Sequence, residues 1–225
     1  MPITLMGLLE GLAAPTASSL LVYMAASRIP GLAASRWASS LSIVSGFVTG
    51  AFALGLNGVS PSSHWQWLPY AAVCTLAAGP VAQASGVACW ERGILYLFVA
   101  AICGWLLTPT WDSLSPDRTT HIVVWTVSVV ALSWLLDPLP GLIPGSLPAF
   151  LFTAALLATA LVQFSAGSLR FAEYAVVGAA AAFGLALAHA RAPNATLGAA
   201  FSFAVIASGV ALVGKVNSFS DVPLI

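Results

Sequence analysis

Eight long apolar runs, separated by short polar or proline-rich segments, make up most of the chain. Each run approaches the ~20 apolar residues that a helix needs to cross ~30 Å of hydrocarbon. Apolar and polar residues do not alternate in these runs, as they do in the strands of a membrane barrel. The predicted spans are 3–25, 38–57, 68–88, 92–109, 121–137, 143–163, 170–190 and 196–214.

The connections between the runs are too short to hold a soluble domain. Within lipid, backbone N–H groups must be paired inside their own segment, so a helix is the expected form of each run. The pattern therefore predicts an all-α fold: one polytopic integral membrane helical bundle of about eight transmembrane helices, covering residues 1–225.

Seven spans are the alternative. The segment 137–145 contains three prolines and two glycines, which remove backbone donors and loosen the backbone. If it formed part of a re-entrant hairpin, 121–137 and 143–163 would cross the membrane only once between them. We favour eight spans because both runs approach spanning length.

Composition agrees with the pattern. Of the 225 residues 60% are hydrophobic and 6% are charged, and the formal net charge is zero. Soluble domains spend roughly a quarter of their residues on charge, and disordered chains lack such apolar content. Seven basic residues form no surface for nucleic acid. We therefore expect the lipid bilayer as the main partner and the plasma (inner) membrane as the location.

Basic residues set the expected orientation. Arg28 and Arg36 flank the first connection, and the positive-inside rule places that loop in the cytoplasm and the N-terminus outside. The other charge pairs near span ends are expected to be solvated or to face lipid headgroups. These pairs are Glu91 with Arg92, Asp117 with Arg118, and Arg170 with Glu173.

Polar groups collect where two spans are interrupted by proline. Pro15 and Pro80 each free a carbonyl one turn earlier, and Thr16 and Gln83 lie beside them. Transporters often build their binding sites from interrupted helices of this kind. The alternative is that neighbouring helices simply satisfy the freed backbone groups.

Two acidic residues extend this pattern. Glu10 lies well inside the first run, and Asp137 ends the fifth run. A carboxylate within a membrane is costly and often functional. Glu10 could instead reach the interface or be protonated, and Asp137 could cap the helix break. The candidate substrate or ion pathway comprises Glu10, Pro15, Thr16, Pro80, Gln83 and Asp137.

Small residues recur one turn apart in the first two spans. Gly7 with Gly11 and Gly46 with Gly50 have the spacing that allows two helices to approach closely. We expect these faces to pack within the bundle, with a dimer face as the alternative.

The sequence argues against catalysis. It has no H-E-x-x-H helix and no pair of facing acids, and its three histidines lie at or beyond span ends. Its three cysteines include no C-x-x-C pair. We expect no enzyme activity, metal site or cofactor.

The leading hypothesis is a small transporter or permease for a small solute or ion. The alternative is a non-catalytic scaffold or assembly subunit that binds other membrane subunits or itself.

Overall fold

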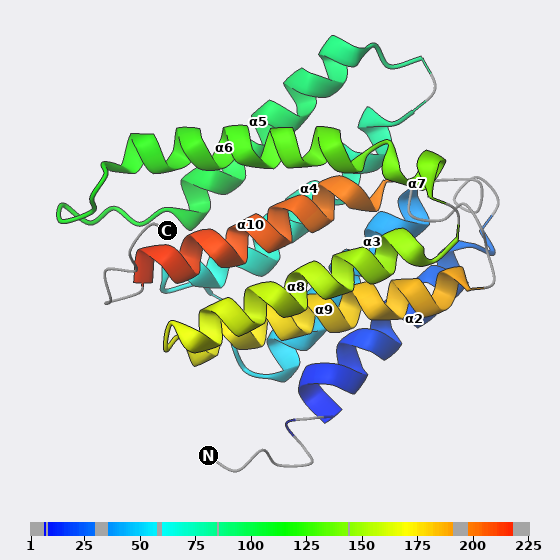
Figure 1. The fold of residues 1–225 in the computed structure, drawn as a ribbon, viewed down its shortest axis with the longest axis horizontal. Helices are drawn as coiled ribbons and strands as arrows, with labels where there is room; N and C mark the ends of the chain where they lie inside the picture. The colour runs from blue at the N-terminus through cyan, green and yellow to red at the C-terminus, as the bar shows by residue number, and fades with distance from the viewer. Residues whose placement is uncertain are drawn as a thin grey trace.

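The computed structural model describes residues 7, 9–29, 36–57, 60–84, 86–143, 145–190 and 198–217, and these contain helices and turns but no strand. Three elements are short: the π-helix η1 (Leu9–Ala13), the 3-10 helix η2 (His64–Trp67) and α7 (Leu139–Leu142). The longer helices pack side by side (Figure 1). They are α2 (Ala14–Ala26), α3 (Trp37–Ala53), α4 (Leu68–Ala82), α5 (Cys89–Leu107), α6 (Arg118–Leu136), α8 (Leu147–Ser165), α9 (Leu169–His189) and α10 (Ala199–Asn217).

Each predicted span overlaps one of these longer helices, and the secondary structure is all-helical where the structure describes it. Residues 3–6 and 8 of the first predicted span and 196–197 of the last lie outside the described residues. Five helices are long and apolar enough to cross a membrane: α5, α6 continued through α7 to Leu142, α8, α9 and α10. Helix α3 is also apolar but has only 17 residues. The helical membrane bundle is therefore supported, whereas eight crossings are not confirmed.

Two helices end earlier than their apolar runs, and glycine or proline explains both ends. Helix α3 stops at Ala53 because Gly55 adopts φ +64°, and the Leu56 N–H then turns back to the Ala51 carbonyl at 3.0 Å. A left-handed glycine is a common way to close a helix. Helix α4 stops at Ala82, two residues after Pro80, and Gly86 at φ +94° redirects the chain.

The proline-rich segment after α6 is a break between two long helices. Helices α6 and α8 each have 19 residues, and the four residues of α7 lie between them. The stretch Arg118–Leu142, which joins α6 and α7, and helix α8 are each long and apolar enough to cross a bilayer. The choice between seven and eight spans stays a prediction.

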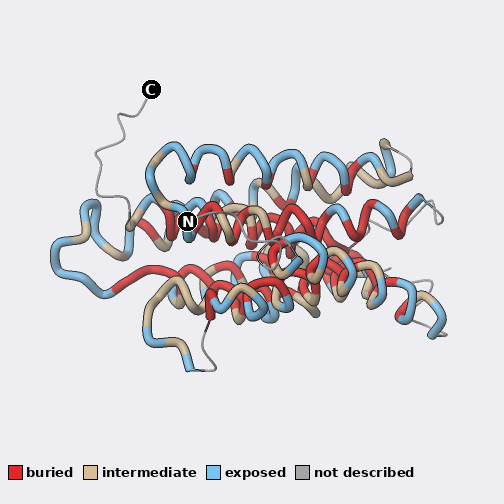
Figure 2. The backbone as a smooth tube through the Cα atoms, turned by 90° about the horizontal axis from the view of Figure 1, so that it is seen from below, coloured by how far each residue is buried: buried red, intermediate tan, exposed pale blue. Residues whose placement is uncertain are grey.

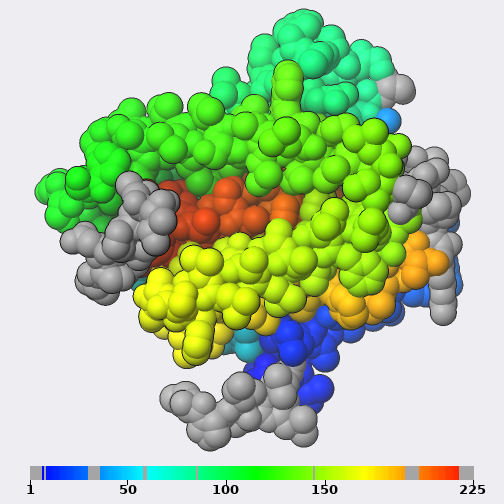
Figure 3. Space-filling view, viewed as in Figure 1, coloured from blue at the N-terminus to red at the C-terminus, as the bar shows by residue number. Residues whose placement is uncertain are grey.

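Helices α9 and α10 form the centre of the bundle. Over their 18 most apolar consecutive residues, 78% of the residues of α9 and 72% of those of α10 are buried. The corresponding shares are 28% for α5 and 22% for α6 with α7. Figure 2 shows the buried segments concentrated in the interior, while outer helices present exposed faces. Helix α10 is visible between α6 and α8 in Figure 3. The stacked rings of Phe152 and Phe203, 4.1 Å apart, join α8 to α10.

The predicted glycine faces pack inside the bundle. A Cβ on Gly46 would lie 2.7 Å from the Pro15 carbonyl oxygen and 2.8 Å from the Ala181 Cβ. One on Gly50 would lie 2.5 Å from Val177. These two glycines thus let α3 approach both α2 and α9.

The first glycine pair, Gly7 and Gly11, precedes α2 in the chain. A Cβ on Gly11 would lie 3.4 Å from the side chain of Leu54, which follows the end of α3. Gly7 is helical and half-buried.

The outer faces of α5 and α6 are strongly apolar. Trp90, Phe98 and Leu135 are 66%, 64% and 71% exposed. In water, contiguous apolar patches of this kind are unusual outside binding sites. In a bilayer they are the expected surface for acyl chains.

Candidate functional site

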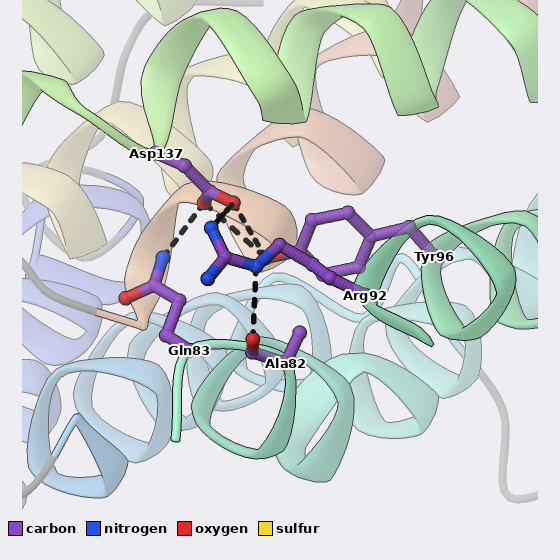
Figure 4. A network of polar contacts seen from close by, with 5 residues as sticks. All are labelled: Ala82, Gln83, Arg92, Tyr96 and Asp137. Carbon is purple, nitrogen blue, oxygen red and sulfur yellow. Dashed lines mark hydrogen bonds and ion pairs between the residues drawn. The ribbon is translucent and has the colours of Figure 1, made fainter. Parts of the chain in front are cut away.

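A buried carboxylate lies where α4, α5 and α6 meet. Asp137 follows α6, and its backbone N–H still bonds the Ser133 carbonyl at 2.8 Å. Its side chain is only 7% exposed. Gln83, Arg92 and Tyr96 converge on this carboxylate (Figure 4). We call these four residues the Asp137 cluster.

Tyr96 holds the carboxylate from the α5 side. Its hydroxyl donates to Asp137 Oδ2 at 2.9 Å and to Oδ1 at 3.2 Å. The Tyr96 ring is fully buried and stacks on Phe201 of α10, with centroids 4.4 Å apart and planes at 6°. Because stacking fixes the ring, the position of the hydroxyl is set by the packing of α5 against α10.

Arg92 links the cluster to the end of α4. Its Nε donates to the Ala82 carbonyl at 2.9 Å, and its Nη1 lies 3.8 Å from Asp137 Oδ2. Carbonyls in the last turn of a helix have no partner within the helix, so this contact closes α4. The expectation that Arg92 is only a solvated loop charge is wrong, since Arg92 lies in α5 and is 32% exposed.

Gln83 supplies the fourth contact and an unused acceptor. Its Nε2 donates to Asp137 Oδ1 at 2.7 Å. Its side-chain oxygen is buried and has no hydrogen-bond partner in the described part of the chain. The amide cannot be turned over without placing that oxygen against the carboxylate. In Figure 4 the oxygen points away from Asp137. A buried acceptor left unpaired costs about 1–3 kcal/mol, so a donor from a ligand or water would be favoured there.

Two of the predicted pathway residues, Gln83 and Asp137, are thus in direct contact, although 54 positions separate them. Glu10 is not part of this cluster. It lies half-buried in η1, and its neighbour Gly11 faces Leu54 at the C-terminal end of α3. Asp137 lies beside the C-terminal end of α4, at the opposite end of the helices. Within the described residues, the structure records no hydrogen bond or ion pair for the side chain of Glu10.

Neighbouring helices use the Thr16 hydroxyl beside Pro15 and the backbone carbonyl that Pro80 frees. Thr16 donates to the Ala180 carbonyl of α9 at 3.0 Å. Pro80 leaves the Leu76 carbonyl without its helical donor, and the Ser40 hydroxyl of α3 donates to that carbonyl at 3.2 Å. Pro15 and Pro80 are both buried. Pro15 is the second residue of α2, which begins where the irregular segment η1 ends.

A group of buried hydroxyls between helices was not predicted as a set. Ser40 and Thr75 both contact Ser202 of α10, at 3.1 and 2.8 Å. Ser19 and Ser42 contact each other at 2.7 Å. All five are fully buried. Each bonds a backbone carbonyl or another hydroxyl. We therefore interpret the role of these hydroxyls as structural: their hydrogen bonds hold α2, α3, α4 and α10 together.

The comparisons give no family for this chain: no family model, curated protein or solved structure matches it.

Proposed function

We propose that the protein is a small membrane transporter or permease, with eight membrane crossings, and that the Asp137 cluster is its solute site. The observation that supports this most is the combination of a buried carboxylate with the buried, unpaired oxygen of Gln83. Intramembrane ionisable groups are expensive and are typical of solute and ion pathways.

Charge and donor count indicate the kind of solute. Arg92 offsets the charge of Asp137 at 3.8 Å, so the cluster has little net charge to attract a free ion. The acceptor on Gln83 favours a molecule that can donate a hydrogen bond. A small uncharged solute with N–H or O–H groups fits these two conditions.

Access to the buried site requires motion of helix ends. The cluster joins the end of α4, the start of α5 and the end of α6. Gly86, at φ +94°, lies between α4 and α5, and Gly145, at φ +77°, lies between α7 and α8, further along the connection that follows α6. Terminal and loop positions of this kind absorb backbone changes in hinge motions. Breaking the Asp137 contacts would free the end of α6 from α4 and α5, which the Arg92–Ala82 bond still joins.

Flux into proteoliposomes tests the proposal. Urea and glycerol are suitable probes, because both are small, uncharged and rich in donors, and stopped-flow light scattering follows their entry. Wild-type protein should accelerate entry of at least one probe over protein-free vesicles. Gln83→Met, which removes both the unpaired oxygen and the donor to Asp137 at similar size, and Asp137→Asn should lower that rate several-fold. Asp112→Asn, an exposed acid outside the cluster, is the matched control. Equal rates for all variants would contradict the role of the cluster.

The scaffold hypothesis is the second candidate, and the outer apolar face of α5 and α6 favours it. That face exposes Trp90, Phe98 and Leu135, and a protein subunit could cover it in place of lipid. Purification from native membrane in mild detergent distinguishes the two functions. A stoichiometric membrane partner together with no flux for either probe would favour the scaffold.

A further inference from the structure

A second polar pocket lies at the other end of α6. It has a volume of about 530 Å³ and is lined by η2, the end of α5, the following loop and the first residue of α6. Ligand sites commonly have volumes of 300–1,000 Å³. Arg118 begins α6 and Asp137 follows its end, so about 27 Å of helix separates this pocket from the Asp137 cluster.

Arg118 is fixed at the wall of the pocket. Its guanidinium lies 4.0 Å above the ring of Trp105, and it donates to the carbonyls of Trp105 at 3.0 Å and Thr108 at 3.3 Å. These bonds use two of the five N–H donors of an arginine. The other donors have no acceptor among the described residues. The guanidinium of Arg118 is therefore held in one orientation and can still donate hydrogen bonds to a ligand.

The surroundings of this guanidinium favour an anion. Arg170 lies 5.8 Å from the ring of Trp65, another residue of the pocket wall, and adds a positive charge that the nearby Glu173 partly offsets. The nearest acid in sequence, Asp117, is not in the wall. Its carboxylate accepts from the Thr119 and Thr120 N–H groups at 3.1 and 3.3 Å.

The apolar part of the wall fits a molecule at the membrane surface. Trp105 and Trp111 are 60% and 46% exposed, and such indoles typically lie at the level of lipid headgroups. A planar guanidinium matches the oxygens of a phosphate in a two-bond geometry. We propose that this pocket binds a phosphate group, carried by a phospholipid headgroup or free in solution, through Arg118. This site is independent of the solute site.

Native mass spectrometry of the detergent-purified protein tests the proposal with three probes. These are a short-chain phosphatidic acid, the diacylglycerol with the same chains, and inorganic phosphate. Wild-type protein should bind phosphatidic acid at least tenfold more tightly than diacylglycerol. Binding of phosphatidic acid alone identifies lipid as the source, whereas binding of inorganic phosphate as well shows that the free ion suffices.

Variants assign the binding to Arg118. Arg118→Gln should weaken binding of phosphatidic acid about tenfold, as expected for charge-assisted hydrogen bonds. Lys215→Gln removes an exposed charge at the same end of the bundle but outside the pocket wall, and should leave the affinity unchanged. Because Arg118 also closes α5, Trp111→Leu in the exposed loop is a second variant and should weaken binding several-fold. Equal effects of Arg118→Gln and Lys215→Gln, unchanged binding in Trp111→Leu, or no wild-type preference for the phosphate-bearing lipid would overturn the proposal.

Discussion

The Tyr96 hydroxyl donates to both carboxylate oxygens of Asp137, at 2.9 and 3.2 Å, and so joins the middle of α5 to the end of α6. The same ring stacks on Phe201 of α10. One side chain therefore couples a polar contact at the helix ends to apolar packing in the core.

Tyr96→Phe tests this coupling. The ring can still stack on Phe201, but Asp137 loses a donor while its side chain stays buried. We expect a loss of about 1–3 kcal/mol in the free energy of unfolding, measured as a lower thermal midpoint in detergent. Tyr23→Phe is the control, since the structure records no hydrogen bond for the Tyr23 hydroxyl in the described regions. Equal midpoints for the two variants would show that the Tyr96 contact contributes nothing.

The contact between Ser40 and Leu76 predicts an interaction between two substitutions. Ser40→Ala leaves the Leu76 carbonyl without a donor, because Pro80 cannot supply one. Pro80→Ala restores a backbone N–H to that carbonyl. Ser40→Ala should therefore cost about 1 kcal/mol more in the wild-type background than in Pro80→Ala. A double-mutant cycle on unfolding free energies measures the difference, and strict additivity would contradict the interpretation.

The close packing of α2 and α9 against Gly46 predicts that any larger side chain at this position destabilises the protein. Gly46→Ala places a Cβ 2.7 Å from the Pro15 carbonyl oxygen and 2.8 Å from the Ala181 Cβ, so α2 or α9 must shift. We expect destabilisation of about 1–3 kcal/mol. Gly141→Ala is the matched control, because a Cβ there meets nothing within 4 Å. Thermal unfolding of both variants in the same detergent measures the contrast, and comparable losses would argue against this packing.

His64 predicts a dependence of stability on pH. Burial lowers the pKa of His64 from 6.5 to about 4, and its Nε2 lies 2.9 Å from Asn217 Nδ2 at the end of α10, where a neutral ring can accept. The unfolded chain binds a proton near pH 6.5 and the folded chain only near pH 4. The stabilisation is therefore complete above pH 6.5 and is lost as the pH falls from 6.5 towards 4. Thermal midpoints across this range should decline less for His64→Gln than for wild type, and parallel curves would remove His64 as the cause.

Much of the fold could be predicted because an apolar run in lipid must pair its backbone groups within itself, and a helix does so. Each predicted span overlaps one of the eight longer helices in the described part of the chain. The ends were less predictable: the run 68–88 remains apolar beyond Ala82, but backbone chemistry at Pro80 and Gly86 ends α4 there. Spacing alone could not show whether the shorter helices cross the membrane.

The candidate site could be predicted only in part. Gln83 and Asp137 stand out as polar residues in apolar surroundings, but their contact depends on how α4 and α6 pack. Tyr96 gave no signal, since a tyrosine in an apolar run resembles any core aromatic. Arg92 looked like a charge at a span end, and only the fold shows that it reaches Ala82. Contacts between distant segments have no local pattern.

Membrane integration is the claim on which the transport and headgroup proposals both depend. Alkaline carbonate extraction of membranes that contain the full chain tests it most directly. The apolar faces of α5, α6, α8, α9 and α10 predict that the protein stays in the membrane pellet and is released only by detergent. Recovery of the intact chain in the carbonate supernatant without detergent would contradict the account.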